Sequence, residues 1–331
     1  MAALTLVTGS AGHLGEALVR TARACGDDVR GLDIRPSPFT DHVGSVSDPT
    51  FVAKCMAGVR AVIHTATLHK PHVATHSARD FVDTNVKGTL TLLEAAVSNS
   101  IESFVFTSST SAFGAALNPA LSEPAAWIVE DVPSVPKNIY GTTKVMAESL
   151  CELIHRKRGL PVLVLRTSRF FPEADDDPRQ RETYSTENLQ ANELLHRRVD
   201  LEDVVSAHRL AVEQAPRVGF RRYIISATTP FTHDELPQLR RSAPEVVRRH
   251  FPEYEALYSS RSWRLFAGLD RVYVNTLART ELGWQPRHDF RFVLDQLSAG
   301  AEFRSPLALQ VGSKGYHEEV FADGPYPVAA D

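Results

Sequence analysis

The amino-acid sequence predicts an α/β fold in which a doubly wound parallel sheet carries a smaller C-terminal lobe. Short runs rich in β-branched residues alternate with longer helical stretches over the first half of the 331 residues. This alternation is typical of a parallel sheet covered by helices on both faces. Beyond residue 166 the alternation becomes irregular, which indicates a second, mixed unit.

The elements of the first half follow one another in regular order. Strands are expected at residues 4–8, 28–33, 59–65, 104–108 and 162–166, and helices at 15–25, 51–57, 80–98 and 139–158. The helix at 80–98 is the clearest of them, because its apolar residues recur at helical spacing.

The second half divides between the sheet and the lobe. Residues 201–214 and 223–225 have the pattern of one more helix and strand, and two helical pieces lie near 234–241 and 244–250. We therefore expect a sheet domain of residues 1–166 to which 196–226 return, and a lobe of interleaved residues 167–195 and 227–331. The tail after residue 299 shows no clear periodicity, and its role stays open.

Composition and charge exclude several classes of protein. The formal net charge of −4 argues against nucleic acid or an anionic membrane as the main partner. No apolar run approaches the roughly 20 residues that span a bilayer, and the N-terminus lacks the pattern of a signal peptide. The three cysteines are far apart, and no Cys and His residues cluster as a zinc site requires. We expect a cytoplasmic globular protein without a metal.

A glycine-rich turn joins the first strand to the first helix. It reads Thr8-Gly9-Ser10-Ala11-Gly12-His13-Leu14-Gly15. A pyrophosphate needs close approach of the backbone, and free N–H groups at a helix N-terminus attract it. The strand–turn–helix setting makes this triplet of glycines informative. The turn predicts that residues 1–166 form a Rossmann domain that binds a dinucleotide.

Asp33 ends the second strand and bears on the choice of cofactor. A carboxylate at this position can accept both ribose hydroxyls of NAD and would repel the 2′-phosphate of NADP. Arg35 lies two residues further on and could pair with that phosphate, or Asp33 could be an ordinary turn residue. The sequence favours NAD.

Tyr140 and Lys144 are spaced to lie on one face of a helix. A phenol is a poor base at neutral pH, but an ammonium one turn away and a positively charged nicotinamide would both lower its pKa. The hydroxyl-rich run 107–111 follows a strand whose C-terminal end should face the ligand crevice. A hydroxyl there can hydrogen-bond the oxygen of a substrate. Together with the glycine-rich turn, the Tyr140–Lys144 pair and this hydroxyl-rich run predict proton transfer coupled to redox chemistry.

Several motifs in sequence order resemble one known family. They are the glycine turn, Val62-Ile63-His64-Thr65-Ala66, Asn85-Val86-Lys87-Gly88-Thr89, Thr107-Ser108-Ser109, Tyr140 with Lys144, Asp203-Val204-Val205 and Leu282-Gly283-Trp284-Gln285-Pro286. Over roughly residues 3–300 the chain resembles the extended short-chain dehydrogenases/reductases. Within them it is similar to the NAD-dependent epimerase/dehydratase family, which includes UDP-galactose 4-epimerase.

The resemblance assigns roles to individual residues. It implies that Ser109 is the catalytic hydroxyl, Tyr140 the base and Lys144 its electrostatic partner, which also holds the nicotinamide ribose. The cofactor-binding residues that follow from the turn, from Asp33 and from the resemblance are Gly9, Gly12, His13, Leu14, Gly15, Asp33, His64, Thr65, Ala66, Asn85, Tyr140 and Lys144. Ser109, Thr110 and Arg271 are expected to contact the substrate.

The chain departs from the family mainly in the substrate half. After the strand at 162–166 the family often has an asparagine and a Tyr-Gly-Pro-like turn, whereas this chain has Thr167-Ser168-Arg169-Phe170-Phe171-Pro172. Ser45 stands where an aspartate commonly meets the adenine. Val274 and Leu277 replace an Asp and a Lys. His69, His72 and His76 fall in a loop that faces the substrate in the family.

The resemblance implies an NAD-dependent oxidoreductase or isomerase acting on a small molecule, and a nucleotide-sugar 4-epimerase is favoured. The alternative is an NAD-dependent dehydrogenase of a sugar, aldonate or other secondary alcohol, which would release NADH. A regulatory protein that binds NAD without catalysis is a third possibility, against which the intact Ser109, Tyr140 and Lys144 argue. The family also leads us to expect a homodimer through the helices at 80–98 and 139–158.

Overall fold

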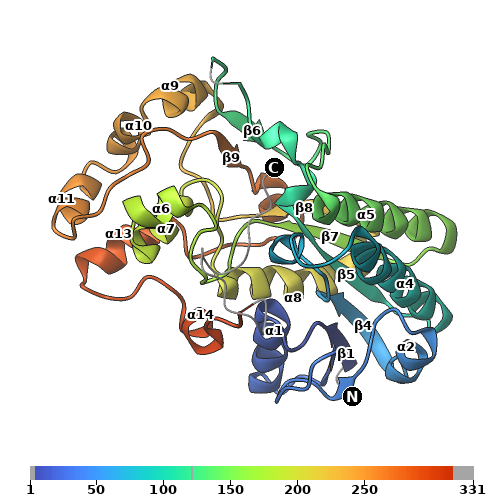
Figure 1. Cartoon of the computed structure of the whole chain (residues 1–331). Coiled ribbons are helices and arrows are strands. Elements are labelled where there is room, and N and C mark those ends of the chain that lie inside the picture. Colours follow the sequence, from blue (N-terminus) through green and yellow to red (C-terminus); the bar gives the residue numbers. More distant parts are fainter. Residues whose placement is uncertain (1–3, 121, 316–331) are drawn as a thin grey trace.

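The computed structural model describes residues 4–120 and 122–315 and contains the expected parallel sheet (Figure 1). Seven strands lie in the order β3-β2-β1-β4-β5-β7-β8, and all neighbouring pairs are parallel. Their bounds are β1 (Leu4–Thr8), β2 (Val29–Asp33), β3 (His42–Val43), β4 (Val59–His64), β5 (Ser103–Ser109), β7 (Val162–Thr167) and β8 (Phe220–Ile225). The predicted α/β fold is confirmed. The short edge strand β3 was not predicted.

Helices cover both faces of the sheet. Successive strand residues point to opposite sides, and apolar residues on both sides need to be buried. On one face Val7, Ile63 and Val105 pack against α1 (His13–Ala24) and α8 (Leu201–Val218). On the other face their neighbours Leu6, Val62 and Phe104 form a separate core. The helices on that side are α2 (Pro49–Cys55), α4 (Gly88–Ser98) and α5 (Ile139–Arg158). Burial on both faces explains the nearly continuous apolar strands.

The expected helix at 80–98 is interrupted. It consists of α3 (Ala78–Phe81), the π-helical turn η2 (Val82–Lys87) and α4. Single π-turns within helices often occur at functional sites. Here η2 carries the buried Asn85, whose role is described below.

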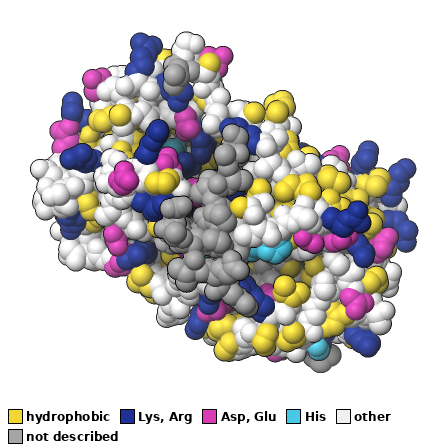
Figure 2. Space-filling view, viewed as in Figure 1, with side chains coloured by type: hydrophobic (Ala, Val, Ile, Leu, Met, Phe, Trp, Pro, Cys, Tyr) yellow, Lys and Arg dark blue, Asp and Glu magenta, His cyan; other side chains and the backbone are white. Residues whose placement is uncertain are grey.

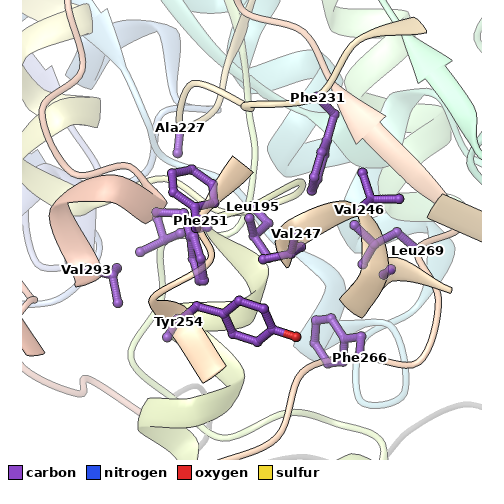
Figure 3. Close-up of a cluster of buried hydrophobic side chains, with 14 of the residues drawn as sticks. Leu195, Ala227, Phe231, Val246, Val247, Phe251, Tyr254, Phe266, Leu269 and Val293 are labelled. Carbon is purple, nitrogen blue, oxygen red and sulfur yellow. The ribbon is translucent and has the colours of Figure 1, made fainter. Parts of the chain in front are cut away.

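The smaller lobe has its own core and a two-stranded parallel sheet. β6 (Ala126–Ile128) pairs with β9 (Arg271–Tyr273), far apart in sequence. Figure 3 shows the core side chains converging, with Phe231, Phe251 and Phe266 among them. The lobe's helices are α7 (Thr186–Glu193), α9 (Leu236–Arg241), α10 (Ala243–His250), α11 (Tyr254–Ser259) and α13 (Phe290–Ser298), and the short α6 (Pro178–Thr183) precedes them.

Some segments lie on the other side of the expected domain division. β6 falls within residues 1–166 but pairs with the lobe strand β9. Conversely, α12 (Thr276–Glu281) and α14 (Pro306–Val311) contribute Ala278 and Val311 to the core on the α1 and α8 face of the large sheet. Trp284, fully buried, belongs to the same core.

The face seen in Figure 2 carries interspersed positive and negative side chains, and apolar side chains gather where α4 and α5 lie. Val82 of η2 and Met146 and Leu153 of α5 are among the exposed large apolar residues. They belong to the helices through which a homodimer was expected, and the homodimer stays a prediction. Among the described residues, no helix is long and apolar enough to cross a membrane.

Candidate active site

A large cavity of about 1730 Å³ opens at the C-terminal ends of the strands. Strand order reverses between β1 and β4, and in such sheets ligands bind at this switch point. The cavity runs from the glycine turn past Asp33 and Tyr140 to Arg271. Parallel register places Ser109 beside Thr167 at the same edge of the sheet. The sheet therefore gathers the predicted residues into one cleft.

The glycine turn has the geometry that a dinucleotide requires. Gly9 has a φ of +74°, and a Cβ at Gly15 would lie 1.9 Å from the Gly9 carbonyl oxygen. Gly12 occupies the N-cap of α1 and has no side chain to cover the first turn. Gly9, Gly12 and Gly15 all line the cavity, as do His13 and Leu14. The residues present thus fit the pyrophosphate of NAD at a helix N-terminus.

Asp33 lies at the far end of the same turn, largely buried and on the cavity wall. One carboxylate oxygen accepts the backbone N–H of Ala11 at 3.0 Å, and the other accepts that of Arg35 at 2.9 Å. Arg35 and the exposed Ile34 also line the cavity. The carboxylate is held in place where a ribose would lie.

We predict that NAD binds at least about tenfold more tightly than NADP, and that Asp33→Ala narrows this ratio. The physical reason is repulsion between a fixed carboxylate and the 2′-phosphate. Calorimetric titration with both dinucleotides measures the ratio. Asp28→Ala, which removes an exposed carboxylate just before the opposite end of β2, is the control and should leave it unchanged. Equal affinities in the unmodified protein would show that Arg35 controls the choice.

Ser109, Tyr140 and Lys144 come together as the sequence predicted. Asn138 caps α5 by accepting the N–H of Gly141, which sets Tyr140 in the first turn. The Ser109 side chain hydrogen-bonds the phenol of Tyr140. Lys144, buried one turn along α5, donates from Nζ to the carbonyl of Thr107 at 2.8 Å. Its Nζ lies 6.0 Å from the centre of the Tyr140 ring.

The pKa of Tyr140 is raised by its surroundings in the protein, whereas the sequence predicted that Lys144 would lower it. Burial raises the pKa of Tyr140 to about 12, and the hydrogen bond from Ser109 opposes only part of that rise. Burial also lowers the pKa of Lys144 to about 7, against the attraction of Glu148. Protein groups alone therefore leave the phenol neutral at neutral pH. Ionisation of Tyr140 needs an additional positive charge, such as that of an oxidised nicotinamide.

Two residues expected to bind the cofactor lie outside the cavity wall. His64 is buried beneath it, with Nδ1 2.8 Å from the Thr8 hydroxyl and Nε2 3.0 Å from that of Thr89. The Thr89 hydroxyl donates to the Asn85 carbonyl, so His64 Nε2 must carry the proton. Burial lowers the pKa of His64 to about 3, which keeps it neutral. Its side chain supports the cleft and does not line it, unlike Thr65 and Ala66.

Asn85 acts through the backbone of the cleft. Its amide exchanges two hydrogen bonds with the backbone of Leu68, at 2.8 and 2.9 Å. It also donates to Thr143 of α5 at 3.0 Å. The side chain thus ties the loop after β4 to α5.

Three arginines line the end of the cavity away from the glycine turn, namely Arg169, Arg197 and Arg271, and only Arg271 is predicted from the sequence. Arg271 pairs with Asp270 at 2.6 Å, and its Nε has no hydrogen-bond partner among the described residues. Arg169 pairs with Asp175 at 3.1 Å and Arg197 with the fully buried Glu193 at 3.0 Å, as part of a network there. Thr110 and Ser168 also line this end.

Part of this end could have been found from the sequence. Arg169 follows the end of β7, where side chains of a parallel sheet meet the ligand crevice. Arg197 lies in a stretch without periodicity, so no local pattern of the sequence indicates that its side chain faces the cavity.

A histidine-rich loop also lines the cavity. His69, His72 and His76 all line the cavity, and the His69 ring stacks on Phe171 at 5.4 Å between centroids. Lys70 of the same loop forms an ion pair with Asp176 across the cleft. No group of three or more His, Cys, Asp or Glu residues within 4–120 and 122–315 is arranged to hold a metal ion.

A Rossmann sheet with a serine, a tyrosine and a lysine at its C-terminal edge defines an extended short-chain dehydrogenase/reductase. The model of the NAD dependent epimerase/dehydratase family matches residues 5–225. The chain belongs to this family, and its cofactor is accordingly NAD, as the sequence predicted.

Individual proteins are similar over nearly the whole chain. A UDP-glucose 4-epimerase of Lactobacillus helveticus is 25% identical over 321 residues, which span 86% of this chain and 92% of the relative. A short-chain dehydrogenase/reductase superfamily protein of Agrobacterium tumefaciens, solved with bound NAD, has a TM-score of 0.63 at 24% identity, with coverage of 89% and 96%. A UDP-glucose 4-epimerase of Thermotoga maritima, solved with UDP-glucose, has a TM-score of 0.60 at 20% identity, with coverage of 86% and 94%.

Proposed function

We propose that the protein is a nucleotide-sugar 4-epimerase that works with bound NAD. The main support is the continuity of one cavity from the glycine turn, past Tyr140, to Arg169, Arg197 and Arg271. At about 1730 Å³ it exceeds the range of roughly 300–1,000 Å³ typical of a site for one ligand. A dinucleotide and a second large anionic ligand could therefore bind together. The similarity to UDP-glucose 4-epimerases agrees with this proposal.

The residues of the cleft suggest how the reaction would proceed. Tyr140, as phenolate, would take the proton of a sugar hydroxyl, while Ser109 hydrogen-bonds the same oxygen. Lys144 would stabilise the phenolate by its charge and hold the nicotinamide ribose. NAD supplies the acceptor, and afterwards the donor, of a hydride. The three arginines would hold the rest of the substrate while the intermediate turns its other face, and no net redox change results.

A dehydrogenase acting on a sugar, aldonate or other secondary alcohol is the second candidate. One observation favours it: Arg169, Arg197 and Arg271 are each already paired with a carboxylate. A diphosphate would have to compete with these internal partners, whereas a neutral polyol would not. The third possibility, a regulatory protein without catalysis, gains no support from a cleft that brings Ser109, Tyr140 and Lys144 together.

Nucleotide binding separates the two candidates. UDP should bind, and Arg271→Ala should weaken binding by about 1.5–3 kcal/mol, the range for hydrogen bonds to charged groups. Calorimetry measures both affinities, and Arg279→Ala, which removes an exposed arginine on α12, is the control. If neither UDP, GDP nor dTDP binds, the epimerase proposal fails and the dehydrogenase takes its place.

A further inference from the structure

Three segments that are far apart in sequence meet at the carboxylate of Glu173. Its Oε1 atom accepts from His13 Nε2 at 2.7 Å, from the Ser313 hydroxyl at 2.8 Å and from the Lys314 backbone N–H at 3.2 Å. His13 begins α1, Glu173 lies on the loop after β7, and Ser313 follows α14. One carboxylate therefore joins the glycine turn, the loop after β7 and residues 313–315, which we call the C-terminal segment.

The Lys314 side chain fastens the C-terminal segment a second time. Its ammonium forms an ion pair with Glu16, a buried residue in the first turn of α1. Lys314 and Gly315 line the same cavity as Gly12 and His13. Residues 313–315 thus lie beside the turn where the pyrophosphate of NAD is expected.

The charge of Glu173 does not suit contact with a diphosphate. Burial would raise the pKa of this carboxyl, but hydrogen bonds from His13 and Ser313 and the charge of His13 hold it at about 2. An ionised carboxylate therefore lies close to the site for two negative phosphates, and this placement costs electrostatic energy. A role in holding the C-terminal segment explains why an acid lies there.

We propose that Glu173 fastens residues 313–315 over the phosphate end of the cofactor cleft, and that this fastening slows the release of NAD. Glu173, Ser313 and Lys314 are then positioning residues for the cofactor. His13 forms the fixed side of the fastening, and the C-terminal segment forms the side that must move. Lys314 also offsets the charge of Glu16 beside the phosphates. Cofactor exchange requires these contacts to break first.

The test measures whether one substitution slows or speeds the release of the dinucleotide. Glu173→Ala removes a negative charge near the phosphates, so electrostatics alone predicts slower release of the dinucleotide. Loss of the fastening predicts the opposite, faster release by at least about tenfold, because several hydrogen bonds to a charged group are lost. The NADH-loaded full-length protein is mixed with excess NAD, and the decay of NADH fluorescence gives the rate constant for release.

Milder variants and matched controls complete the experiment. Ser313→Ala and Lys314→Ala should also speed release. The Glu173→Ala/Lys314→Ala double variant should release faster than either single variant, because Lys314 holds the segment separately through Glu16. Glu182→Ala and Lys54→Ala remove exposed charges elsewhere and should stay within about twofold of the unmodified protein. Unchanged or slower release in Glu173→Ala overturns the proposal. If that variant fails to fold, unchanged release in both Ser313→Ala and Lys314→Ala overturns it. No substrate is used, so the outcome is independent of the proposed function.

Discussion

Tyr140→Phe should reduce turnover by about 10² or more, the usual contribution of a positioned general base. The substitution removes one oxygen from a buried ring and leaves its packing in place. The hydrogen bond from Ser109 is lost, but the contact of Lys144 with the Thr107 carbonyl does not depend on the phenol. Fold and NAD binding should therefore be nearly unchanged, as circular dichroism and calorimetry would measure. A variant that keeps most of its activity would show that the proton leaves by another route.

The pH dependence of the reaction tests the same assignment. Burial raises the pKa of Tyr140 to about 12, so phenolate forms only at high pH unless a cation lowers that value. With oxidised NAD bound, the rate should rise with pH through a midpoint well below the free tyrosine value near 10. Lys144→Met keeps the length of the side chain and removes its charge, which should move the midpoint upward. A midpoint that does not move would remove Lys144 from the role of electrostatic partner.

Glu148→Ala should destabilise the fold by about 3–5 kcal/mol, because it leaves the buried cation Arg166 without its carboxylate partner. Glu148 lies one turn beyond Lys144 on α5 and is 1% exposed. Its carboxylate accepts from the Ser108 hydroxyl at 2.6 Å and from Arg166 at 2.7 and 3.0 Å. Arg166 is itself buried in β7 and cannot reach water when its partner is removed. Chemical denaturation measures the change in the free energy of unfolding.

Glu152 provides a matched control for this experiment. Arg222 pairs with both acids, with Glu148 at 3.1 Å and with Glu152 at 2.7 Å, but the Glu152 side chain is 39% exposed. Glu152→Ala should cost no more than about 1 kcal/mol, since exposed ion pairs contribute little. If both substitutions cost the same, burial of the Glu148 network is not what stabilises this part of the fold.

The sequence predicted those parts of the fold and site that depend on local patterns. The glycine turn, Asp33 at a strand end, and Tyr140 with Lys144 at helical spacing each occupy a short stretch of chain. In a parallel sheet the C-terminal ends of the strands meet at one edge. Ser109 could therefore be placed near Tyr140 without knowledge of the structure.

The remaining features depend on contacts between distant residues. β6 and β9 are three residues each, too short to show alternation, and each requires the other to form. The fastening of Ser313 and Lys314 to Glu173 likewise leaves no local pattern. His64 was misplaced because resemblance assigns a stretch of chain to the cofactor. Successive side chains of a strand point to opposite sides, so only some residues of that stretch can face the cofactor. The imidazole of His64 is held away from the cleft by Thr8 and Thr89.

The pairing of β6 with β9 also constrains the order in which the chain can assemble during synthesis. The large sheet has all seven strands once Ile225 has left the ribosome. β6 emerges well before that point, yet its partner lies at Arg271–Tyr273 and the lobe core extends to Phe303. Domains generally fold as units during translation. The nascent chain must therefore carry an unpaired strand and an open apolar surface until residues 271–303 have been translated, and this interval is when a chaperone would have most to bind.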